Sequence, residues 1–238
     1  MDSLTLPQLL ALAAALGWAS GVRLYLVVLL TGLAGYFGWV QLPGGLQLLA
    51  HPAVLAASGF MTFVEFFADK IPGLDSLWDM VHTVIRIPAG AALAAGVFGA
   101  DHSTMALVAA VVGGGLAATS FTAKATTRAA LNTSPEPFSN AGASLVEESA
   151  VTGGLWLAFT HPLLFGILLV VVLALSVWLI RKSWRFLKML LGRVVRIFSG
   201  RPDPGVTSVF HRKDAAVVEN TEATVPQNND HGKDENGL

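Results

Sequence analysis

Long apolar stretches follow one another along this chain with few charges between them. Asp, Glu, Lys and Arg are absent from residues 3–22, 24–50, 52–64, 87–100, 103–123, 149–160 and 162–180. An α-helix needs about 20 mainly apolar residues to cross the roughly 30 Å hydrocarbon core of a bilayer. Several runs reach this length, and the run at 162–180 is the least ambiguous. The pattern predicts an all-α, polytopic transmembrane bundle within residues 1–180, with six or seven crossing or re-entrant segments.

The composition of the chain agrees with this pattern. The chain is 53% hydrophobic and 13% charged, whereas about 25% of the residues in an ordinary soluble domain are charged. A soluble helical bundle would need polar faces that these runs lack. Cysteine is absent, which excludes disulfides, thiol catalysis and cysteine metal sites. The opening MDSLTLPQ has no basic region, so we expect the first apolar segment to stay in the mature protein.

The first apolar region, residues 4–42, is too long for one straight span. The segment ASGVR at 19–23 interrupts it, but this segment is too short and too apolar to be an ordinary external loop. A broken or re-entrant helix would explain the interruption. A kink at Ser20-Gly21 within one tilted helix is the alternative.

The two halves of the chain show a weak internal similarity. Each half contains a His-Pro dipeptide before an apolar helix, a tryptophan after it and a run of small residues upstream. These features are His51-Pro52 and His161-Pro162, Trp78 and Trp184, and residues 17–23 and 114–120. The two units would cover residues 4–86 and 103–199. If the chain is duplicated, an inverted repeat with broken helices meeting near the bilayer midplane is the expected geometry, as in many secondary transporters.

Residues 74–86, LDSLWDMVHTVIR, combine an apolar face and a polar face at helical spacing. Asp79 and His82 on the polar face could suggest a metal site, but an interfacial helix explains them with fewer assumptions. Such a helix shows its polar face to water or headgroups. The apolar face comprises Leu74, Leu77, Trp78, Val81 and Ile85, and the polar face comprises Asp75, Asp79, His82 and Arg86.

A group of positive charges follows the last apolar run. Residues 181–199 place apolar side chains at helical spacing among six cations without an acid. This pattern is typical of a helix that lies on the membrane and binds anionic lipid headgroups. The predicted headgroup-binding residues are Arg181, Lys182, Arg185, Lys188, Arg193 and Arg196.

The positive-inside tendency predicts that this end of the chain is cytoplasmic, in a cell (inner) membrane. Nucleic-acid binding by the same basic stretch is disfavoured, because the adjoining span fixes it to a bilayer. Residues 200–238 are polar and lack apolar periodicity, so we expect a disordered tail.

Ionisable residues interrupt the apolar runs at several places. Burying one of them in a bilayer costs at least about 2.5–3.5 kcal/mol. We therefore expect these side chains to pair across helices or to line a wet cavity. Together with the loop residue Asn140, the candidates for a transport or pairing site are Arg23, Glu65, Asp69, Lys124, Arg128, Glu147 and Glu148.

A Ser/Pro/Asn turn at residues 132–140 separates two of the charge-bearing helices. Its two prolines prevent one continuous helix, and its Ser and Asn residues can cap the helix ends. A helical hairpin would bring Lys124 and Arg128 close to Glu147. The alternative is that Lys124, Arg128 and Glu136 mark helix ends at headgroup level and pair there without a transport role.

Three segments together resemble domain-of-unknown-function family 4126, a family of multi-pass membrane proteins found largely in bacteria. The distinctive strings are E-x-x-x-D-K-I-P-x-L-D, which begins at Glu65, and N-x-S-P-E-P-x-S-N, which begins at Asn132. The SGVR segment at 20–23 fits as well, and the resemblance spans roughly residues 8–180. In the family's second motif the acidic pair usually reads Glu-Asp, whereas this sequence has Glu147-Glu148. The resemblance implies fold and membrane residence.

The sequence leaves two main classes of function open. One is a small secondary transporter or channel, in which Glu65 or Glu147 exchanges protons or binds a cation. The other is a membrane-anchored structural or adaptor protein that recruits a partner through its basic helix and tail. An intramembrane enzyme is disfavoured because no HExxH, GxSxG or Walker motif occurs. We therefore expect no catalytic residues, cofactor or resident metal. The expected partners are the lipid bilayer and an ion or small-molecule substrate, and a homo-oligomer stays open.

Overall fold

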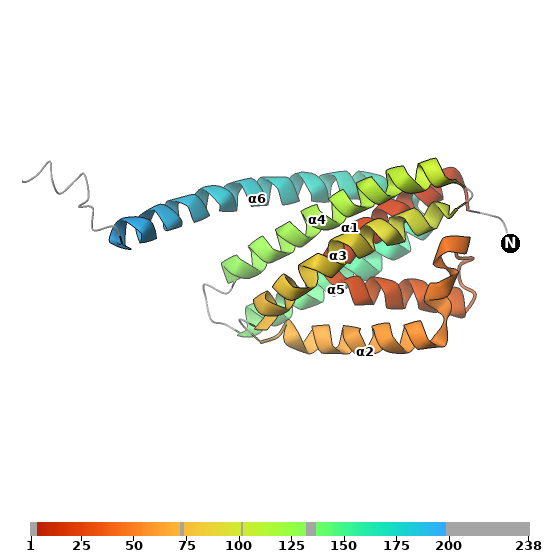
Figure 1. The fold of residues 1–238 in the computed structure, drawn as a ribbon, viewed down its shortest axis with the longest axis horizontal. Helices are drawn as coiled ribbons and strands as arrows, with labels where there is room; N and C mark the ends of the chain where they lie inside the picture. The colour runs from red at the N-terminus through yellow and green to blue at the C-terminus, as the bar shows by residue number, and fades with distance from the viewer. Residues whose placement is uncertain (1–3, 72–73, 101, 132–136, 199–238) are drawn as a thin grey trace, which may run out of the picture. The chain divides into compact units, whose positions relative to one another are not determined.

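The protein is an all-α bundle, which confirms the predicted fold class. The computed structural model describes residues 4–71, 74–100, 102–131 and 137–198 (Figure 1). In chain order the helices are α1 (Leu6–Tyr36), the 3-10 helix η1 (Gly44–Ala50), α2 (Pro52–Ala68), α3 (Leu74–Phe98), α4 (Ser103–Leu131), α5 (Pro137–Thr160) and α6 (Pro162–Phe198). The basic stretch predicted as a separate helix at 181–199 is helical as the C-terminal part of α6. The predicted tail at 200–238 lies outside the described residues.

Local sequence determines where several helices begin and end. Thr5 and Gln8 form a capping box at the start of α1, with the Thr5 amide 2.8 Å from the Gln8 side-chain oxygen. The Nδ1 atom of His51 accepts from the amide of Ala53 at the start of α2. Gly99 has φ +65° immediately after α3, a conformation that glycine adopts without strain. The His-Pro dipeptide at the start of α2 thus acts as a helix start signal.

Glycines bring α1, α3 and α4 into close contact. A Cβ atom added at Gly17 would lie 2.6 Å from the Cα of Gly113, and one added at Gly90 would lie 2.7 Å from the Cβ of Ala117. Small residues of this kind let membrane helices approach closely and gain van der Waals contacts. Gly113 also packs on Ala94. Because residue numbers rise along α4 as they fall along α3 at these contacts, the two helices are antiparallel.

The chain reverses its direction within α1. In the N-terminal half, Gly17 lies against Gly113 of α4, and Gly21 lies against Ala117. Residue numbers rise together along both helices, so this half is parallel to α4. In the C-terminal half, Gly32 lies against Leu55 of α2, and Leu29 lies against Gly59. Residue numbers fall along α1 as they rise along α2, so this half is antiparallel to α2. The helix α2 is itself antiparallel to α3, because Glu65 pairs with Arg86 while η1 packs on the far end of α3.

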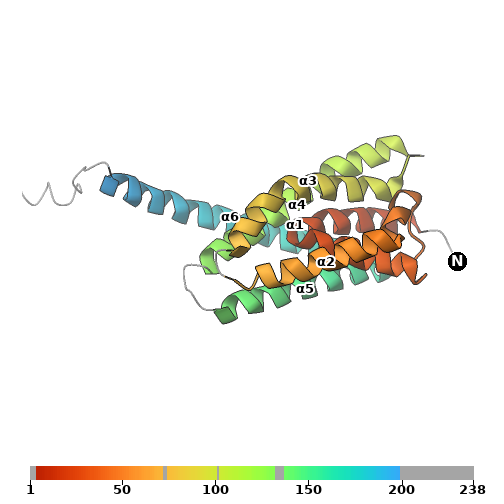
Figure 2. The same ribbon diagram turned by 60° about the horizontal axis from the view of Figure 1, so that its bottom comes forward.

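These directions require the two halves of α1 to run in opposite directions, joined at Arg23. This residue has φ −146° and ψ 84°, which is non-helical. Both red segments of α1 extend toward the end of the bundle where the N-terminus lies (Figures 1 and 2). The prediction of a broken, re-entrant helix at 19–23 is therefore confirmed, and the alternative of a mere kink in one tilted span is wrong. Two residues before the break, Gly21 packs closely on Ala117 and Ser120 of α4.

The remaining helices complete the bundle around this hairpin. Gly154 of α5 lies against Trp18, while Glu147 reaches Arg23, so α5 is antiparallel to the N-terminal half of α1. Phe165 of α6 lies near Gly154. The segments that share similar sequence, α2 with α6 and the start of α1 with α4, consequently run in the same direction. These directions would fit a parallel and not an inverted arrangement of the two units, and the duplication itself stays a prediction.

Four helices are long and apolar enough to cross a membrane, within the part of the chain that the structure describes. They are Leu6–Tyr36, Val81–Phe98, Ser103–Leu131 and Pro162–Ser183, and the pair Gly44–Ala50 and Pro52–Ala68, bent by 69°, would be a fifth. This count uses length and composition only, so it takes α1 as one helix although the two halves of α1 run in opposite directions from Arg23. It also leaves out α5, which carries two adjacent glutamates. The six or seven segments expected include re-entrant segments, so this count does not test that number.

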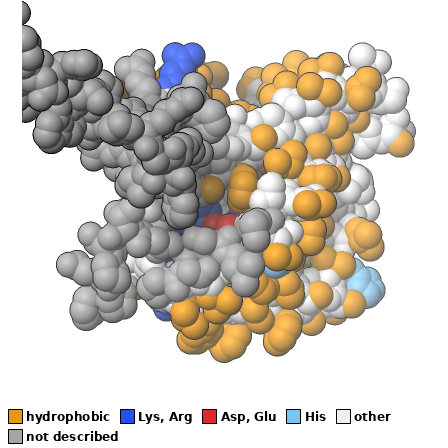
Figure 3. All heavy atoms as spheres, turned by 60° about the vertical axis from the view of Figure 1, so that its left-hand side comes forward, with side chains coloured by type: hydrophobic (Ala, Val, Ile, Leu, Met, Phe, Trp, Pro, Cys, Tyr) orange, Lys and Arg blue, Asp and Glu red, His pale blue; other side chains and the backbone are white. Residues whose placement is uncertain are grey.

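The bundle places apolar side chains outside and charged ones inside. Val84, Val111 and Leu163 are 78%, 71% and 78% exposed, whereas Arg23 and Arg86 are 1% and 0% exposed. The orange side chains dominate the surface in Figure 3, and red and blue side chains appear in a recess between them. A soluble protein would bury the former and expose the latter, so the outer surface of this bundle fits lipid as its solvent.

The polar face of residues 74–86 points inward, which corrects the prediction of an interfacial helix. Asp79, His82 and Arg86 are buried, while Val81 and Ile85 on the opposite face are exposed. These residues form the first part of the long helix α3. The helix is amphipathic as predicted. Its polar face points to the interior of the bundle because Glu65, the partner of Arg86, and Lys124, a partner of Asp79, lie there.

Candidate functional site: a buried ion-pair network

Asp69 is the centre of a network of buried charges. It follows the last turn of α2 and is completely buried. Its Oδ2 atom lies 2.8 Å from Arg23, 3.3 Å from Lys124 and 3.4 Å from Arg128. The Asp69 backbone carbonyl also accepts from Arg128 at 3.0 Å. One carboxylate therefore ties α1, α2 and α4 together, with several cations offsetting the cost of its burial.

Glu147 is a second acidic centre, supplied by α5. Arg128 contacts it through two nitrogens, Nη2 at 3.0 Å from Oε2 and Nε at 3.2 Å from Oε1. Arg23 and Lys124 lie 3.4 Å and 3.5 Å from the same Oε2 atom. The neighbouring Glu148 lies 3.4 Å from Arg23. Asp69 and Glu147 thus share three cations, and a two-nitrogen arginine contact of this type is among the stronger charged hydrogen bonds.

Arg86 carries the network into α3. Its guanidinium donates to Glu65 of α2. It also donates, at 2.6 Å, to Asp79, which lies seven residues (two turns) earlier in α3. Asp79 in turn lies 3.3 Å from Lys124. Lys124 therefore joins the Glu65–Arg86–Asp79 branch to the Asp69–Glu147 branch. The nine charged side chains form one continuous network that reaches all of helices α1 to α5.

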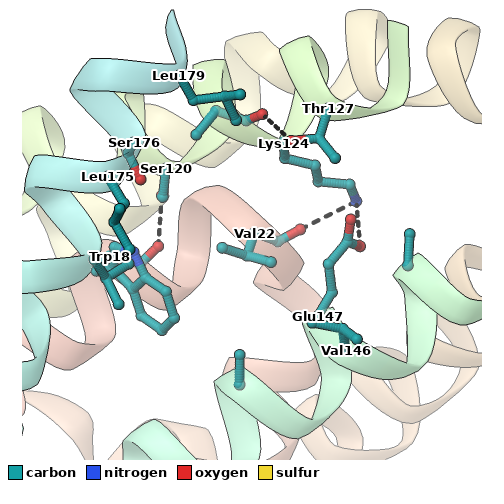
Figure 4. Close-up of a pocket in the computed structure, with 14 residues that line it drawn as sticks. Trp18, Val22, Ser120, Lys124, Thr127, Val146, Glu147, Leu175, Ser176 and Leu179 are labelled. Carbon is teal, nitrogen blue, oxygen red and sulfur yellow. Dashed lines mark hydrogen bonds and ion pairs between the residues drawn. The ribbon is translucent and has the colours of Figure 1, made fainter. Parts of the chain in front are cut away.

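The break in α1 gives the network part of its hydrogen bonding. Residues around a helix interruption have backbone carbonyls that lack their usual helical partner. Lys124 donates to the carbonyl of Val22 at 3.2 Å, and Ser120 donates to the carbonyl of Trp18 at 2.6 Å. Figure 4 shows both α4 side chains reaching the N-terminal half of α1. The interruption is thus stabilised by side chains of α4, in the way that non-helical backbone inside a membrane protein requires.

The start of α5 supplies uncharged partners for Arg128. The Asn140 backbone carbonyl accepts from Nη1 at 3.4 Å, and Ser144 Oγ lies 3.0 Å from Nη2. Both residues are buried. The predicted hairpin across the Ser/Pro/Asn turn is therefore present in the placement of its two helices. The turn residues at 132–136, including Glu136, lie outside the described part of the chain.

A cavity of about 390 Å³ adjoins the network between α1, α4, α5 and α6. Lys124 and Glu147 form its charged wall, and the rest of its lining is mainly apolar. Figure 4 shows Trp18 beside Leu175 and Ser176 of α6, away from Lys124 and Glu147. The lining residues are Trp18, Val22, Ser120, Ala123, Lys124, Thr127, Ala143, Val146, Glu147, Ala150, Val172, Leu175, Ser176 and Leu179. Pockets of this size and composition are typical of small-molecule sites.

The structure brings together all of the residues predicted for the site. Asn140 takes part through its backbone, and the seven charged candidates are members of the network. Sequence reasoning missed Asp79 and Arg86, which it assigned to a surface helix, and it missed Ser144. The signal for Arg86 was present, since its flanking residues Val84, Ile85 and Ile87 left it as the lone cation beside an apolar run.

Two of the six predicted headgroup-binding residues have side chains that the structure describes. Arg181 and Lys182 are exposed near the end of the apolar part of α6, and Lys182 lies 4.9 Å from the ring centre of Trp178. The side chains of the other four, Arg185, Lys188, Arg193 and Arg196, are outside the described part. Lipid binding by this group stays a prediction.

The network carries more acids than cations. Arg23, Arg86, Lys124 and Arg128 face Glu65, Asp69, Asp79, Glu147 and Glu148, which leaves one negative charge in excess when all are ionised. Within the described residues, no three His, Asp or Glu side chains are placed to hold a metal ion together.

These features define a class of protein: a polytopic α-helical membrane protein with a re-entrant helix and a buried ion-pair network. The chain belongs to the family described as a domain of unknown function (DUF4126), which matches residues 10–182. The match covers the whole network, together with the cavity lining. Neither the curated proteins nor the solved structures contain a significant match.

Proposed function

We propose that this protein is a small secondary transporter or channel whose permeation site is the buried ion-pair network. The observation that supports this most is the re-entrant break at Arg23, which points its guanidinium at Asp69 and Glu147. Broken helices that meet at charged residues within the bilayer are the usual architecture of ion and substrate sites in secondary transporters. Ionisable residues that are costly to bury are typical of such pathways.

The network can accept positive charge. It has one acid in excess, and among the described residues four buried carboxylate oxygens lack a hydrogen-bond partner: Glu65 Oε2, Asp69 Oδ1, Asp79 Oδ2 and Glu148 Oε1. An unpartnered buried oxygen is costly unless it is protonated or binds a cation. We therefore expect the coupling ion to be a proton or a small monovalent cation. Glu65, deep in the bundle, and Glu147, at the cavity, are the residues that would carry it.

The distribution of exposed charge supports an orientation in a cell inner membrane. Lys70 follows α2, and Arg181 and Lys182 lie on the parallel helix α6, so these cations share one end of the bundle. Residues 37–51 and 160–161, at the other end, contain no Lys or Arg. By the positive-inside tendency, the end with the cations is cytoplasmic.

Flux through reconstituted protein tests this proposal. We expect proteoliposomes with the wild-type chain to dissipate an imposed proton or cation gradient, and Glu65→Gln and Glu147→Gln to reduce that flux about tenfold or more, since each removes a titratable site. Arg181→Gln, a change on the exposed part of α6, is the matched control and should keep the flux. The signal is a pH-sensitive or cation-sensitive dye inside the vesicles.

The proposal fails if wild-type protein gives no gradient-dependent flux. It also fails if both glutamate variants keep the full flux while their melting temperatures fall, because the charges would then be structural. Deleting residues 200–238 separates the adaptor alternative. A cellular phenotype from this deletion, with flux unchanged, would favour partner recruitment over transport.

A further inference from the structure

The excess acid of the network lies in one of its two branches. Around Asp69, three cations balance three carboxylates. In the other branch, Glu65 and Asp79 share the guanidinium of Arg86. Asp79 has a second cation, the Lys124 ammonium at 3.3 Å, whereas Arg86 is the one cation that forms an ion pair with Glu65 in the described part of the chain. The uncompensated negative charge is therefore centred on Glu65.

Glu65 also has a carboxylate oxygen without a partner. Its side chain is fully buried, and Arg86 donates to Oε1, while Oε2 has no hydrogen-bond partner among the described residues. Oδ2 of Asp79 is buried without a partner in the same way. Burying an uncompensated charge is costly, and a proton on Glu65 removes both the charge and the excess of acid. Four cations then face four carboxylates.

A metal cation suits this branch less well than a proton. Hard metal cations bind about six oxygen ligands, and the described residues place no three His, Asp or Glu side chains together for a metal ion. The Arg86 guanidinium, which contacts both acids, would also repel such an ion. A proton needs one free oxygen atom and no other ligand.

The structure places a buried histidine beside these acids. His82 lies on the same face of α3, three residues after Asp79 and four before Arg86, and it is 7% exposed. Its Nδ1 atom lies 2.8 Å from the carbonyl oxygen of Trp78. Because a carbonyl only accepts, Nδ1 carries a hydrogen, and Nε2 is the nitrogen that gains and loses a proton.

His82 lies between the buried acids and two aromatic side chains that are less buried. Its ring stacks on Trp78 with the ring centres 4.1 Å apart, and it meets the ring of Tyr25 edge-on at 5.8 Å. Both aromatic residues are half-buried, and Tyr25 interacts electrostatically with Glu65. A tyrosine hydroxyl both donates and accepts hydrogen bonds, so Tyr25 can relay a proton between His82 and Glu65. Imidazole groups commonly carry protons near neutral pH.

We infer that the coupling ion is a proton, that Glu65 holds it, and that His82 exchanges it with the end of the bundle where α3 begins. The proton leaves Nε2 of the His82 imidazolium and binds a Glu65 carboxylate oxygen, and His82 then takes up another proton from water. The inference rests on the proposed function, for which it names the ion and the side of exchange. The other charged and titratable groups around this pair are Asp79 and Arg86 of α3, Arg23 and Tyr25 of α1, Lys124 of α4, and Asp69 next to α2.

Infrared spectroscopy of the full-length chain in detergent micelles detects the bound proton. A protonated carboxyl group has a C=O stretching band that a carboxylate lacks. We expect this band from the wild-type chain at neutral pH, and its complete loss in Glu65→Gln. Glu147→Gln is the matched control and should keep the band, because Glu147 lies in the branch whose charges balance. A wild-type chain without the band, or a band lost in Glu147→Gln and kept in Glu65→Gln, would overturn the inference.

Asp79→Asn tests why Glu65 holds the proton. This change leaves Glu65 and Arg86 as one acid and one cation, so Glu65 should ionise and the band should disappear. The size-exclusion profile shows whether the variant is folded. A band that persists in folded Asp79→Asn would mean that the excess of acid does not hold the proton, and the inference would be wrong.

His82→Gln tests the exchange step. Dilution into D2O shifts the carboxyl band, and the rate of this shift measures proton exchange at Glu65. We expect His82→Gln to keep the band at equilibrium, which a misfolded protein would not, but to slow its shift about tenfold or more. Added imidazole should restore part of the rate. His102→Gln, at an exposed histidine just before α4, is the control. Exchange at the wild-type rate in His82→Gln would overturn the role of His82.

Flux through proteoliposomes separates this inference from the proposed function. Flux that follows a pH gradient and stays the same when K⁺ replaces Na⁺ supports the inference. Flux that follows a Na⁺ or K⁺ gradient at constant pH would overturn the inference and leave the proposed function intact. An absence of flux, with the Glu65 band present, would refute the proposed function, while Glu65 would still be established as a proton-binding site.

Discussion

At the scale of single residues, each buried charge in this protein depends on its partners. Arg86 and Glu65 are both fully buried and contact each other, and Arg86 has a second acid in Asp79. Removing charges from water costs several kcal/mol per ion, which a well-placed partner offsets. Loss of one partner therefore leaves the other charge uncompensated, whereas loss of both removes the cost as well as the gain.

Arg86→Met should lower the free energy of unfolding by about 3–5 kcal/mol, because it leaves Glu65 and Asp79 without their cation. Adding Glu65→Gln to Arg86→Met should recover part of this loss. Denaturation of the purified protein in mixed micelles measures both values. Arg181→Met, a change at an exposed arginine, should be nearly neutral. Additive losses in the double variant would show that Glu65 and Arg86 do not interact as the structure indicates.

At the scale of helices, contacts between small residues hold the re-entrant hairpin in place. A Cβ atom at Gly17 of α1 would lie 2.6 Å from the Cα of Gly113 in α4, and a Cβ atom at Gly113 would lie 2.4 Å from the Cβ of Ala94 in α3. This approach places Lys124 of α4 at the Val22 carbonyl beside the break in α1, and Ser120 at the Trp18 carbonyl one turn earlier. Small residues at the interface therefore determine whether the network can assemble.

Gly113→Leu should reduce the yield of folded protein and lower its melting temperature by several degrees, because the side chain would separate α4 from α1 and α3. Gly115→Leu is the control on the same helix, since a Cβ atom there meets no neighbour within 4 Å. Size-exclusion profiles and thermal denaturation in detergent compare the two. Similar behaviour of the two variants would contradict the tight packing of α4 on α3.

At the scale of the whole molecule, the reversal at Arg23 determines which segments share a membrane face. The start of α1 and the segment after it, which includes η1, lie at one end of the bundle. Lys70 and the exposed basic residues of α6 lie at the other. A straight α1 would have placed residue 6 and residue 44 on opposite faces.

Single cysteines can test this topology cleanly because the chain has none of its own. We expect Leu6→Cys and Gly44→Cys to react with a membrane-impermeant maleimide from the same side of the membrane. Lys182→Cys should react from the opposite side, which is the cytoplasmic side in the proposed orientation. Reaction of residues 6 and 44 from opposite sides would refute the re-entrant hairpin, whichever way the protein is oriented.

The sequence by itself determined the helical class, the apolar segments, the break near Arg23 and most of the charged residues of the network. It could do so because helix length, apolar runs and the cost of an isolated charge in lipid are properties of local sequence. The tertiary structure decided the rest: the reversal at Arg23, the parallel direction of the similar helices and the inward turn of Asp79 and Arg86. An amphipathic face fits water and a charged bundle interior equally well, and the choice between them depends on which neighbours the fold supplies.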